Sequence, residues 1–330
     1  MFDTLYIEEA VREHPRTKSI IKRFAGRQVI ECRHYGELFN PKGQNFRLQK
    51  SSPALILANK TGELILPAPS AYAIGAKHNY YFSHMLNCVY DCRYCFLQGM
   101  YRSAHTVLFV NYEDFLGDIR RISRQHDNEP VHFFSGYDGD SLAMEPLSGF
   151  ADFFISEMRD IPNAWLELRT KSTQTRQLLK TTPWPQTVVA CSFTPESISM
   201  ALEHKVPRLE QRLDVLHKLQ QAGWQVGLRL DPLIYTDNYE SAYREVIERI
   251  MQKLDTEKIH SVSFGAFRMP QGFFNNMVKL YPQEKLFAGP MEQDGGMVSY
   301  PADLEQAMRS TCESLLLEHL HDRQLFPCTG

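Results

Sequence analysis

The sequence predicts an α/β fold, a partial (β/α)6 barrel of the TIM type behind a small N-terminal α/β cap. Six apolar, β-branched or aromatic runs alternate with segments of helical spacing, which is typical of a parallel sheet. Six strand–helix units are two short of the eight that close a full barrel, so the sheet is expected to stay open. Its site is then expected in the loops that follow the strands. The runs are NYYFSHML (79–86), VHFFSG (131–136), AWLELRTK (164–171), TVVACSFTP (187–195), WQVGLRLDPLIY (224–235) and IHSVSFGAFR (259–268).

Helical spacing between the runs is clearest from Leu209 to Leu219, a stretch that Gly223 is expected to end. A closing amphipathic helix is expected from Asp303 to His321. The tail that ends in Cys328 is expected to be loose.

The first 76 residues lie outside this series, so we expect two domains, a basic cap at 1–76 and a barrel with a C-terminal helical closing segment at 77–330. The cap is expected to hold a helix near 17–24 and strands at 27–32 and 54–59. Its basic side chains suggest a polyanion partner, although a solvated surface explains them equally well. They are Arg12, Arg16, Lys18, Lys22, Arg23, Arg27, Arg33, Lys42, Arg47, Lys50 and Lys60.

Composition places the chain among globular proteins. It has 330 residues, 43% of them hydrophobic and 23% charged, with 36 Lys plus Arg against 39 Asp plus Glu. A net charge of -3 means that any polyanion site is local. The sequence contains no membrane-spanning run and starts too acidic for a signal peptide, so a cytoplasmic protein without membrane contact is expected.

The most informative string is CVYDCRYC, which places Cys88, Cys92 and Cys95 in a CxxxCxxC motif after the first expected barrel strand. Iron–sulfur clusters are normally held by four thiolates, so three close cysteines imply a cubane with one iron open to a substrate or cofactor. The alternative is a structural zinc site with His84 as the fourth ligand, in a nucleic-acid binding module without catalysis.

With an aromatic residue before its last cysteine, this motif resembles the radical S-adenosylmethionine (radical SAM) superfamily. More narrowly, the chain resembles the spore photoproduct lyase family. The strings that carry the narrower resemblance cover almost the whole chain and are CRYCFLQ, RTKS, CSFTP, LRLDPLIY, FGAFR and DGGMVSYP.

The resemblance implies a 4Fe-4S cluster on the three cysteines, with S-adenosylmethionine chelating the fourth iron through its amino and carboxylate groups. One electron, from a flavodoxin- or ferredoxin-type donor, then yields a 5'-deoxyadenosyl radical that abstracts hydrogen. The implied activity is a carbon–carbon lyase that repairs a cross-linked thymine dimer in DNA. An alternative keeps this cofactor chemistry but acts on a modified RNA base or a small metabolite.

The resemblance also implies roles for single residues. Tyr94 matches the ring that packs on the adenine of the cofactor, although simple packing explains it equally well. Lys171 and Ser192 match positions near the S-adenosylmethionine carboxylate, although a surface lysine and a helix-capping serine are the ordinary alternatives. Tyr300 matches a segment with which the family touches its damaged DNA.

Strand-end geometry adds further candidates. Asp138 and Asp140 could bind a ribose or amino group, or could instead cap the next helix. Asp231 and Arg229 follow the fifth strand and Arg268 follows the sixth, so they are expected at the same mouth, with buried ion pairing as the alternative.

Two positions depart from the family pattern. Tyr137 stands where the family has the cysteine that gives hydrogen to the product radical, and Phe96 stands where it has a tyrosine. Either Tyr137 donates directly, or Cys191 substitutes from a neighbouring strand, or the reaction differs. The ordinary alternative for Cys191 is a small buried apolar side chain.

Overall fold

The computed structural model describes residues 2–127 and 129–328, and its largest element is an eight-stranded sheet in the order β18-β14-β13-β11-β10-β9-β5-β4. Its parallel series confirms the predicted partial barrel and consists of β5 (His78–Phe82), β9 (Val131–Ser135), β10 (Ala164–Thr170), β11 (Thr187–Ser192), β13 (Gln225–Leu233) and β14 (Ile259–Ala266). One strand is added at each edge, antiparallel β4 (Ile65–Pro67) beside β5 and parallel β18 (Leu325–Pro327) beside β14.

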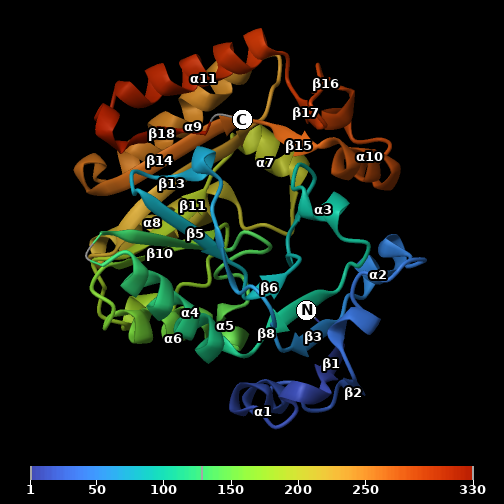
Figure 1. Ribbon diagram of the computed structural model, residues 1–330. Helices are drawn as coiled ribbons and strands as arrows, with labels where there is room; N and C mark the ends of the chain where they lie inside the picture. The colour runs from blue at the N-terminus through green and yellow to red at the C-terminus, as the bar shows by residue number, and fades with distance from the viewer. Residues whose placement is uncertain (1, 128, 329–330) are drawn as a thin grey trace.

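Helices cover the outer face of this curled sheet (Figure 1). They are α4 (Tyr112–Gln125), α6 (Phe150–Met158), α7 (Glu196–Leu202), α8 (Leu209–Gln221), α9 (Tyr239–Lys253) and α11 (Ala302–Leu317). The expected apolar face of α8 is buried, and Gly223 just beyond its end has φ 95°, a left-handed conformation that glycine adopts without strain. No helix in the described parts of the chain is long and apolar enough to cross a bilayer.

Two expectations about the barrel were wrong. Between β10 and β11 the described chain forms only a 3-10 turn, Leu178–Lys180, because Pro183 and Pro185 interrupt any longer helix. The tail is also ordered rather than loose: the N–H of Cys328 donates to the carbonyl of Phe264 at 2.7 Å, and the residue is buried. Apolar burial and strand pairing therefore hold this end against β14.

A second sheet of five strands forms the cap. Its order is β2 (Gln28–Cys32), β1 (Thr4–Glu8), β3 (Leu55–Ala58), β8 (Thr106–Phe109) and β6 (Met85–Leu86), with α1 (Pro15–Lys22) packed on the same apolar core. Strand pairing does not follow the expected boundary at residue 76, because β6 and β8 join the cap sheet while β4 joins the barrel sheet. The division into 1–76 and 77–330 stays a prediction.

The cysteine loop runs from β6 to β8 and is held by both parts of the molecule. Its β7 (Asp91–Cys92) pairs antiparallel with β12 (Glu203–His204), and its short helix α3 (Leu97–Met100) packs against α10 (Gln271–Leu280). The approach of α3 to α10 is so close that a Cβ on Gly99 would lie 2.2 Å from the carbonyl oxygen of Phe273. The loop is therefore fixed at its ends by the cap and in its middle by the barrel.

Candidate active site

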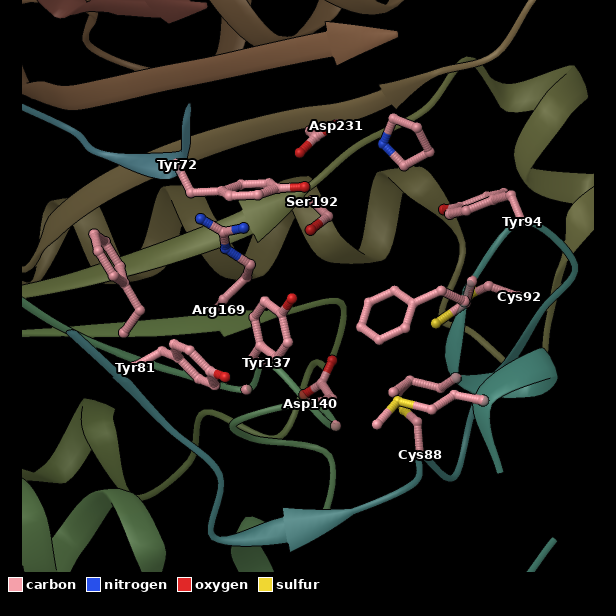
Figure 2. Close-up of a pocket in the computed structure, with 18 of the residues that line it drawn as sticks. Tyr72, Tyr81, Cys88, Cys92, Tyr94, Tyr137, Asp140, Arg169, Ser192 and Asp231 are labelled. Atoms are coloured by element: carbon pink, nitrogen blue, oxygen red, sulfur yellow. The ribbon is translucent and has the colours of Figure 1, made fainter. Parts of the chain in front are cut away.

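A cavity of about 590 Å³ opens where the barrel strands end, a volume that suits a cofactor-sized ligand (Figure 2). The structure brings most of the predicted site residues to its wall. These are Cys88, Cys92, Tyr94, Cys95, Tyr137, Lys171, Ser192 and Asp231.

Two of the predicted catalytic and cofactor-binding residues do not line the cavity. Cys191 is buried with its thiol on the core side of β11, because side chains alternate along a strand and Ser192 faces the cavity. Asp138 is turned toward Ser83 and Tyr101, and burial raises the pKa of its carboxyl. This placement matches the ordinary alternative for Cys191, and a cofactor role for Asp138 stays a prediction.

The three thiols of the motif share one wall of the cavity. Burial raises the pKa of Cys88, Cys92 and Cys95, so they ionise when a metal binds rather than in the free chain. Within the described residues, no three His, Cys, Asp or Glu side chains meet as the ligands of a single ion would. A cubane bonds each thiolate to a different iron, so three thiols spread along one wall fit it.

His84 lies away from these thiols. Its ring stacks on Phe150 with centroids 3.7 Å apart, and its side chain is fully buried in the core. Burial lowers the pKa of His84 to about 3. The packing on Phe150 gives no support to the zinc alternative, which needs this ring beside the cysteines.

Tyr94 is held by a buried ion pair. Its hydroxyl donates to the carboxylate of Glu203, which also accepts from Arg212 Nη2 at 2.7 Å and from Ser199 Oγ at 2.6 Å. Arg212 Nη1 donates to the carbonyl of Ser192 at 2.7 Å. Because Glu203 and Arg212 side chains are both 0% exposed, this network fixes the ring of Tyr94 relative to the end of β11.

Lys171 extends from the end of β10 toward Tyr94, with Nζ 5.5 Å from the ring centroid. Burial alone would lower the pKa of Lys171, but Glu203 and Cys92 nearby raise it above its usual value. The backbone N–H of Lys171 donates to Asp140 Oδ2 at 2.6 Å, and Asp140 Oδ1 accepts from the N–H groups of Leu142 and Ala143. Asp140 therefore organises two turns at the cavity, but it does not cap the next helix, α5 (Glu145–Ser148), which has Met144 at its N-cap.

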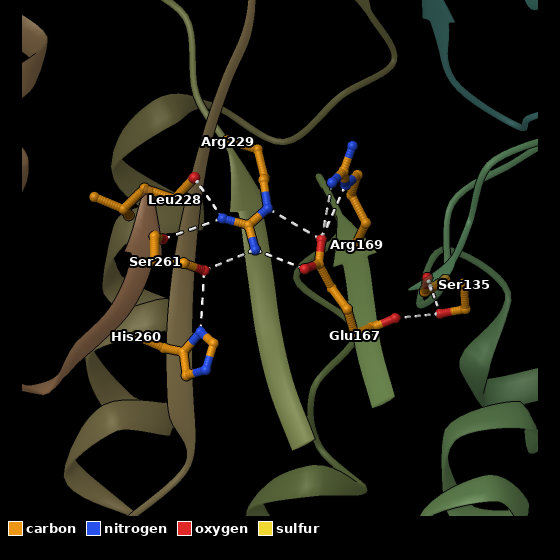
Figure 3. Close-up of polar contacts among 8 residues, drawn as sticks. Ser135, Glu167, Arg169, Leu228, Arg229, His260 and Ser261 are labelled. Carbon is orange, nitrogen blue, oxygen red and sulfur yellow. Dashed lines mark hydrogen bonds and ion pairs between the residues drawn. The ribbon is translucent and has the colours of Figure 1, made fainter. Parts of the chain in front are cut away.

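A buried network beneath the cavity pairs Arg229 with Glu167, a partner that was not predicted (Figure 3). Glu167 Oε1 and Oε2 accept from Arg229 Nε at 3.0 Å and Nη2 at 2.6 Å, and Oε1 also accepts from Arg169 Nε at 3.0 Å. Burial would raise the pKa of Glu167, but Arg229 and then Arg169 lower it to about 2. Arg229 is thus a buried partner rather than a mouth residue, and Arg169 reaches the cavity instead. The string AWLELRTK could have indicated this network, because its Glu167 and Arg169 are opposite charges two residues apart and therefore share one face of an apolar strand.

Other mouth residues are arranged around Asp231. Arg268 Nη1 lies 3.4 Å from Asp231 Oδ1, and its guanidinium stands 5.2 Å from the ring centroid of Tyr72. Burial raises the pKa of Asp231. Tyr300 is buried, and its hydroxyl accepts from the N–H of Tyr235 at 2.9 Å, so contact with DNA is not open to it in this conformation.

Three loop thiols over the mouth of a partial parallel barrel define a radical SAM enzyme, and comparison with known proteins narrows this class. A family model described as spore photoproduct lyase matches residues 1–294. The chain belongs to the spore photoproduct lyase family.

Relatives and solved structures are consistent with this assignment. Spore photoproduct lyase of Bacillus subtilis (strain 168) is 22% identical over 327 residues, covering 94% of each chain. That of Clostridium acetobutylicum is 19% identical over 300 residues, covering 89% of this chain and 86% of the relative. A crystallised spore photoproduct lyase mutant with bound AdoMet and dinucleoside spore photoproduct has a TM-score of 0.85 and 16% identity, covering 100% of this chain and 98% of its own.

Proposed function

We propose that this protein is a radical SAM lyase that repairs a cross-linked thymine lesion of the spore photoproduct type in DNA. The observation that carries the proposal is the single cavity that gathers the three motif thiols with Tyr94, Lys171 and Ser192, in a chain of this family. A solved relative of the same fold binds AdoMet and a dinucleoside spore photoproduct in one structure.

The chain contributes binding and shielding around the cofactors. Cys88, Cys92 and Cys95 would hold a 4Fe-4S cluster, and Lys171 and Ser192 would receive the carboxylate of S-adenosylmethionine. When bound, this pair supplies a 5'-deoxyadenosyl radical. The barrel wall and the clamped cysteine loop would shield the reacting carbon from water on the enclosed sides of the cavity.

Tyr137, which stands where the family has its donor cysteine, is the hydrogen donor that we propose among the tyrosines that line the cavity. It lines the wall with a side chain that is 39% exposed, and burial, followed by the neighbouring Tyr72 and Tyr81, raises its pKa to about 12. The phenol therefore keeps its hydrogen on Oη at neutral pH. Cys191 is buried in the core and does not line the cavity.

The test is anaerobic reconstitution with iron and sulfide, followed by reduction and addition of S-adenosylmethionine. We expect 5'-deoxyadenosine to form and to increase when an oligonucleotide bearing the spore photoproduct is supplied, with thymine restored. Undamaged oligonucleotide is the control. If a modified RNA base or a metabolite stimulates cofactor cleavage and the lesion does not, that molecule is the substrate and the proposed DNA substrate is wrong.

The reduction step needs a one-electron donor, and we propose a flavodoxin- or ferredoxin-type protein. Either delivers single electrons at low potential, as a 4Fe-4S cluster requires. Replacing chemical reductant with a purified flavodoxin and its reductase should support 5'-deoxyadenosine formation.

A further inference from the structure

We propose that Arg169 binds the phosphodiester that links the two nucleotides of the lesion. This inference rests on the proposed function and deepens it, because it assigns a subsite to the backbone of the substrate rather than to its bases. It predicts that the enzyme distinguishes a dinucleotide lesion from a dinucleoside lesion, which lacks the phosphate.

The first support is the geometry of the guanidinium. Nε and Nη2 of Arg169 both lie 3.0 Å from Glu167 Oε1, which fixes the plane of the group. Among residues 2–127 and 129–328, Nη1 has no hydrogen-bond partner, and Arg169 lines the cavity. In Figure 2 the guanidinium is drawn below the ring of Tyr72 and above that of Tyr137, and all three residues line the cavity. A guanidinium held on one edge and open on the other is pre-organised for an oxyanion.

The second support is the charge balance. The charged side chains that line the cavity are three cations and two carboxylates, namely Arg169, Lys171, Arg268, Asp140 and Asp231. The buried Arg229–Glu167 pair beneath them is neutral, so the lining carries one positive charge in excess. A phosphodiester carries one negative charge and presents two free oxygens, which matches both the charge and the open donors of Arg169.

The third support is the position of the group beside Tyr137. A phosphate on Arg169 would place the attached thymines at the phenol that is proposed to give hydrogen. The carboxylate of S-adenosylmethionine is the competing anion, but Lys171, set against Tyr94 on the thiol side of the cavity, already offers it a cation. The cavity therefore has a second cation, Arg169, and the lesion phosphate is the anion that best accounts for it.

The experiment measures equilibrium binding of two spore photoproduct ligands, the dinucleotide with its phosphodiester and the dinucleoside without it. Reconstituted, unreduced enzyme with S-adenosylmethionine is used, so no turnover occurs. We expect the wild type to bind the dinucleotide about tenfold more tightly, a ratio that falls with added salt. Arg169→Gln should reduce the ratio to below about twofold, and Arg169→Lys should give an intermediate value because it keeps the charge but loses the fork.

Folding is not expected to confound this test, because Arg229 still pairs with Glu167 in the Arg169→Gln protein. The matched control is Arg176→Gln, which removes one exposed positive charge from the loop after the same strand and should keep the full ratio. Unfolding of each variant by denaturant confirms equal stability.

The outcomes separate this inference from the proposed function. If the wild type binds both ligands without preference, or if Arg169→Gln keeps the tenfold ratio, the phosphate assignment is wrong while the substrate stands. If Arg169→Gln weakens S-adenosylmethionine binding and leaves the ratio unchanged, the anion is the cofactor carboxylate. If the wild type binds neither ligand, the proposed substrate is wrong and the phosphate assignment is lost with it.

Discussion

The phenol ring of Tyr137 packs on the ring of Tyr81, with centroids 4.4 Å apart and an interplanar angle of 33°. Tyr81 belongs to β5, and Tyr137 follows β9, the strand paired with it. Phe96, directly after the third motif cysteine, lies on another side of Tyr137 with ring centroids 5.7 Å apart. The hydroxyl at the mouth is therefore carried on an aromatic wall that fixes its position.

Replacing Tyr137 by Phe should separate cofactor cleavage from product formation. The variant keeps the ring packing but loses the hydrogen on Oη, so 5'-deoxyadenosine should still form while intact thymine falls at least about tenfold relative to it. Quantifying both products by chromatography checks this. In deuterated buffer, the wild type should place deuterium in the repaired thymine through the exchangeable phenol.

Two variants accompany that experiment. Tyr81→Phe keeps the wall and should repair nearly as well as the wild type if Tyr137 donates directly. Cys191→Ala should also leave the product ratio unchanged. If Tyr137→Phe keeps the wild-type ratio of thymine to 5'-deoxyadenosine and Cys191→Ala loses thymine, the hydrogen donor is Cys191 and not Tyr137.

Cys92→Ala should prevent cluster assembly, because two remaining thiolates cannot hold a cubane. After anaerobic reconstitution, iron and acid-labile sulfide should fall to background and the visible absorption band should be lost. Cys32→Ala, which removes a thiol from strand β2 of the cap, is the matched control and should retain four irons. Zinc in place of iron in both proteins would contradict the assignment.

His84 should make stability depend on pH. Its pKa is about 3 in the folded protein against 6.5 as the ordinary value, so the unfolded chain takes up the proton first. The free energy of unfolding therefore falls as pH falls below 6.5, by about 2 kcal/mol between pH 7 and pH 5 from this residue alone. His84→Phe should remove that part of the slope, as measured by denaturant unfolding at each pH.

The same substitution should raise stability at neutral pH by about 1–3 kcal/mol, since neither ring nitrogen of His84 has a partner among the described residues. The exposed His319→Asn is the control and should leave the slope unchanged. An equal slope in His84→Phe and the wild type would show that the ring is solvated.

Gly99→Ala should destabilise the protein by about 1–3 kcal/mol, because the added methyl group would meet the backbone of α10 and force α3 away from it. In contrast, Gly117→Ala adds a methyl group within α4 where no atom beyond the adjoining helix backbone lies within 4 Å, and should stabilise by about 1 kcal/mol. Thermal unfolding of both variants checks the opposite signs. Since α3 follows Cys95, Gly99→Ala should also lower the iron content.

The sequence predicted the parallel series well because each strand is a short apolar run and each run ends at a polar or turn-forming residue. It predicted the helix around Leu213 for the same local reason. It missed the exchange of β4, β6 and β8 between the two sheets, because strand partners are chosen by tertiary packing that local patterns do not encode. The order of the tail near Cys328 depends on the same kind of distant pairing.

The site was predictable where chemistry is local in sequence, as in the CxxxCxxC motif. It was less predictable where burial decides the outcome. Asp138 and Asp140 are two residues apart and looked equivalent, yet only Asp140 lines the cavity. Arg229 was expected at the mouth but is buried against Glu167, whereas Arg169, for which no position was predicted, lines the cavity.

The exchange of strands across residue 76 has a practical consequence for anyone who wishes to shorten this enzyme. Removing the first 76 residues would take away β3, the partner of β8, and β4, the partner of β5. The two unpaired strand edges would be prone to self-association. Of the two lost strands, β3 is the cap strand that pairs with β8 beside the segment that carries the motif thiols. The barrel part therefore depends on the first 76 residues for two of its strand partners.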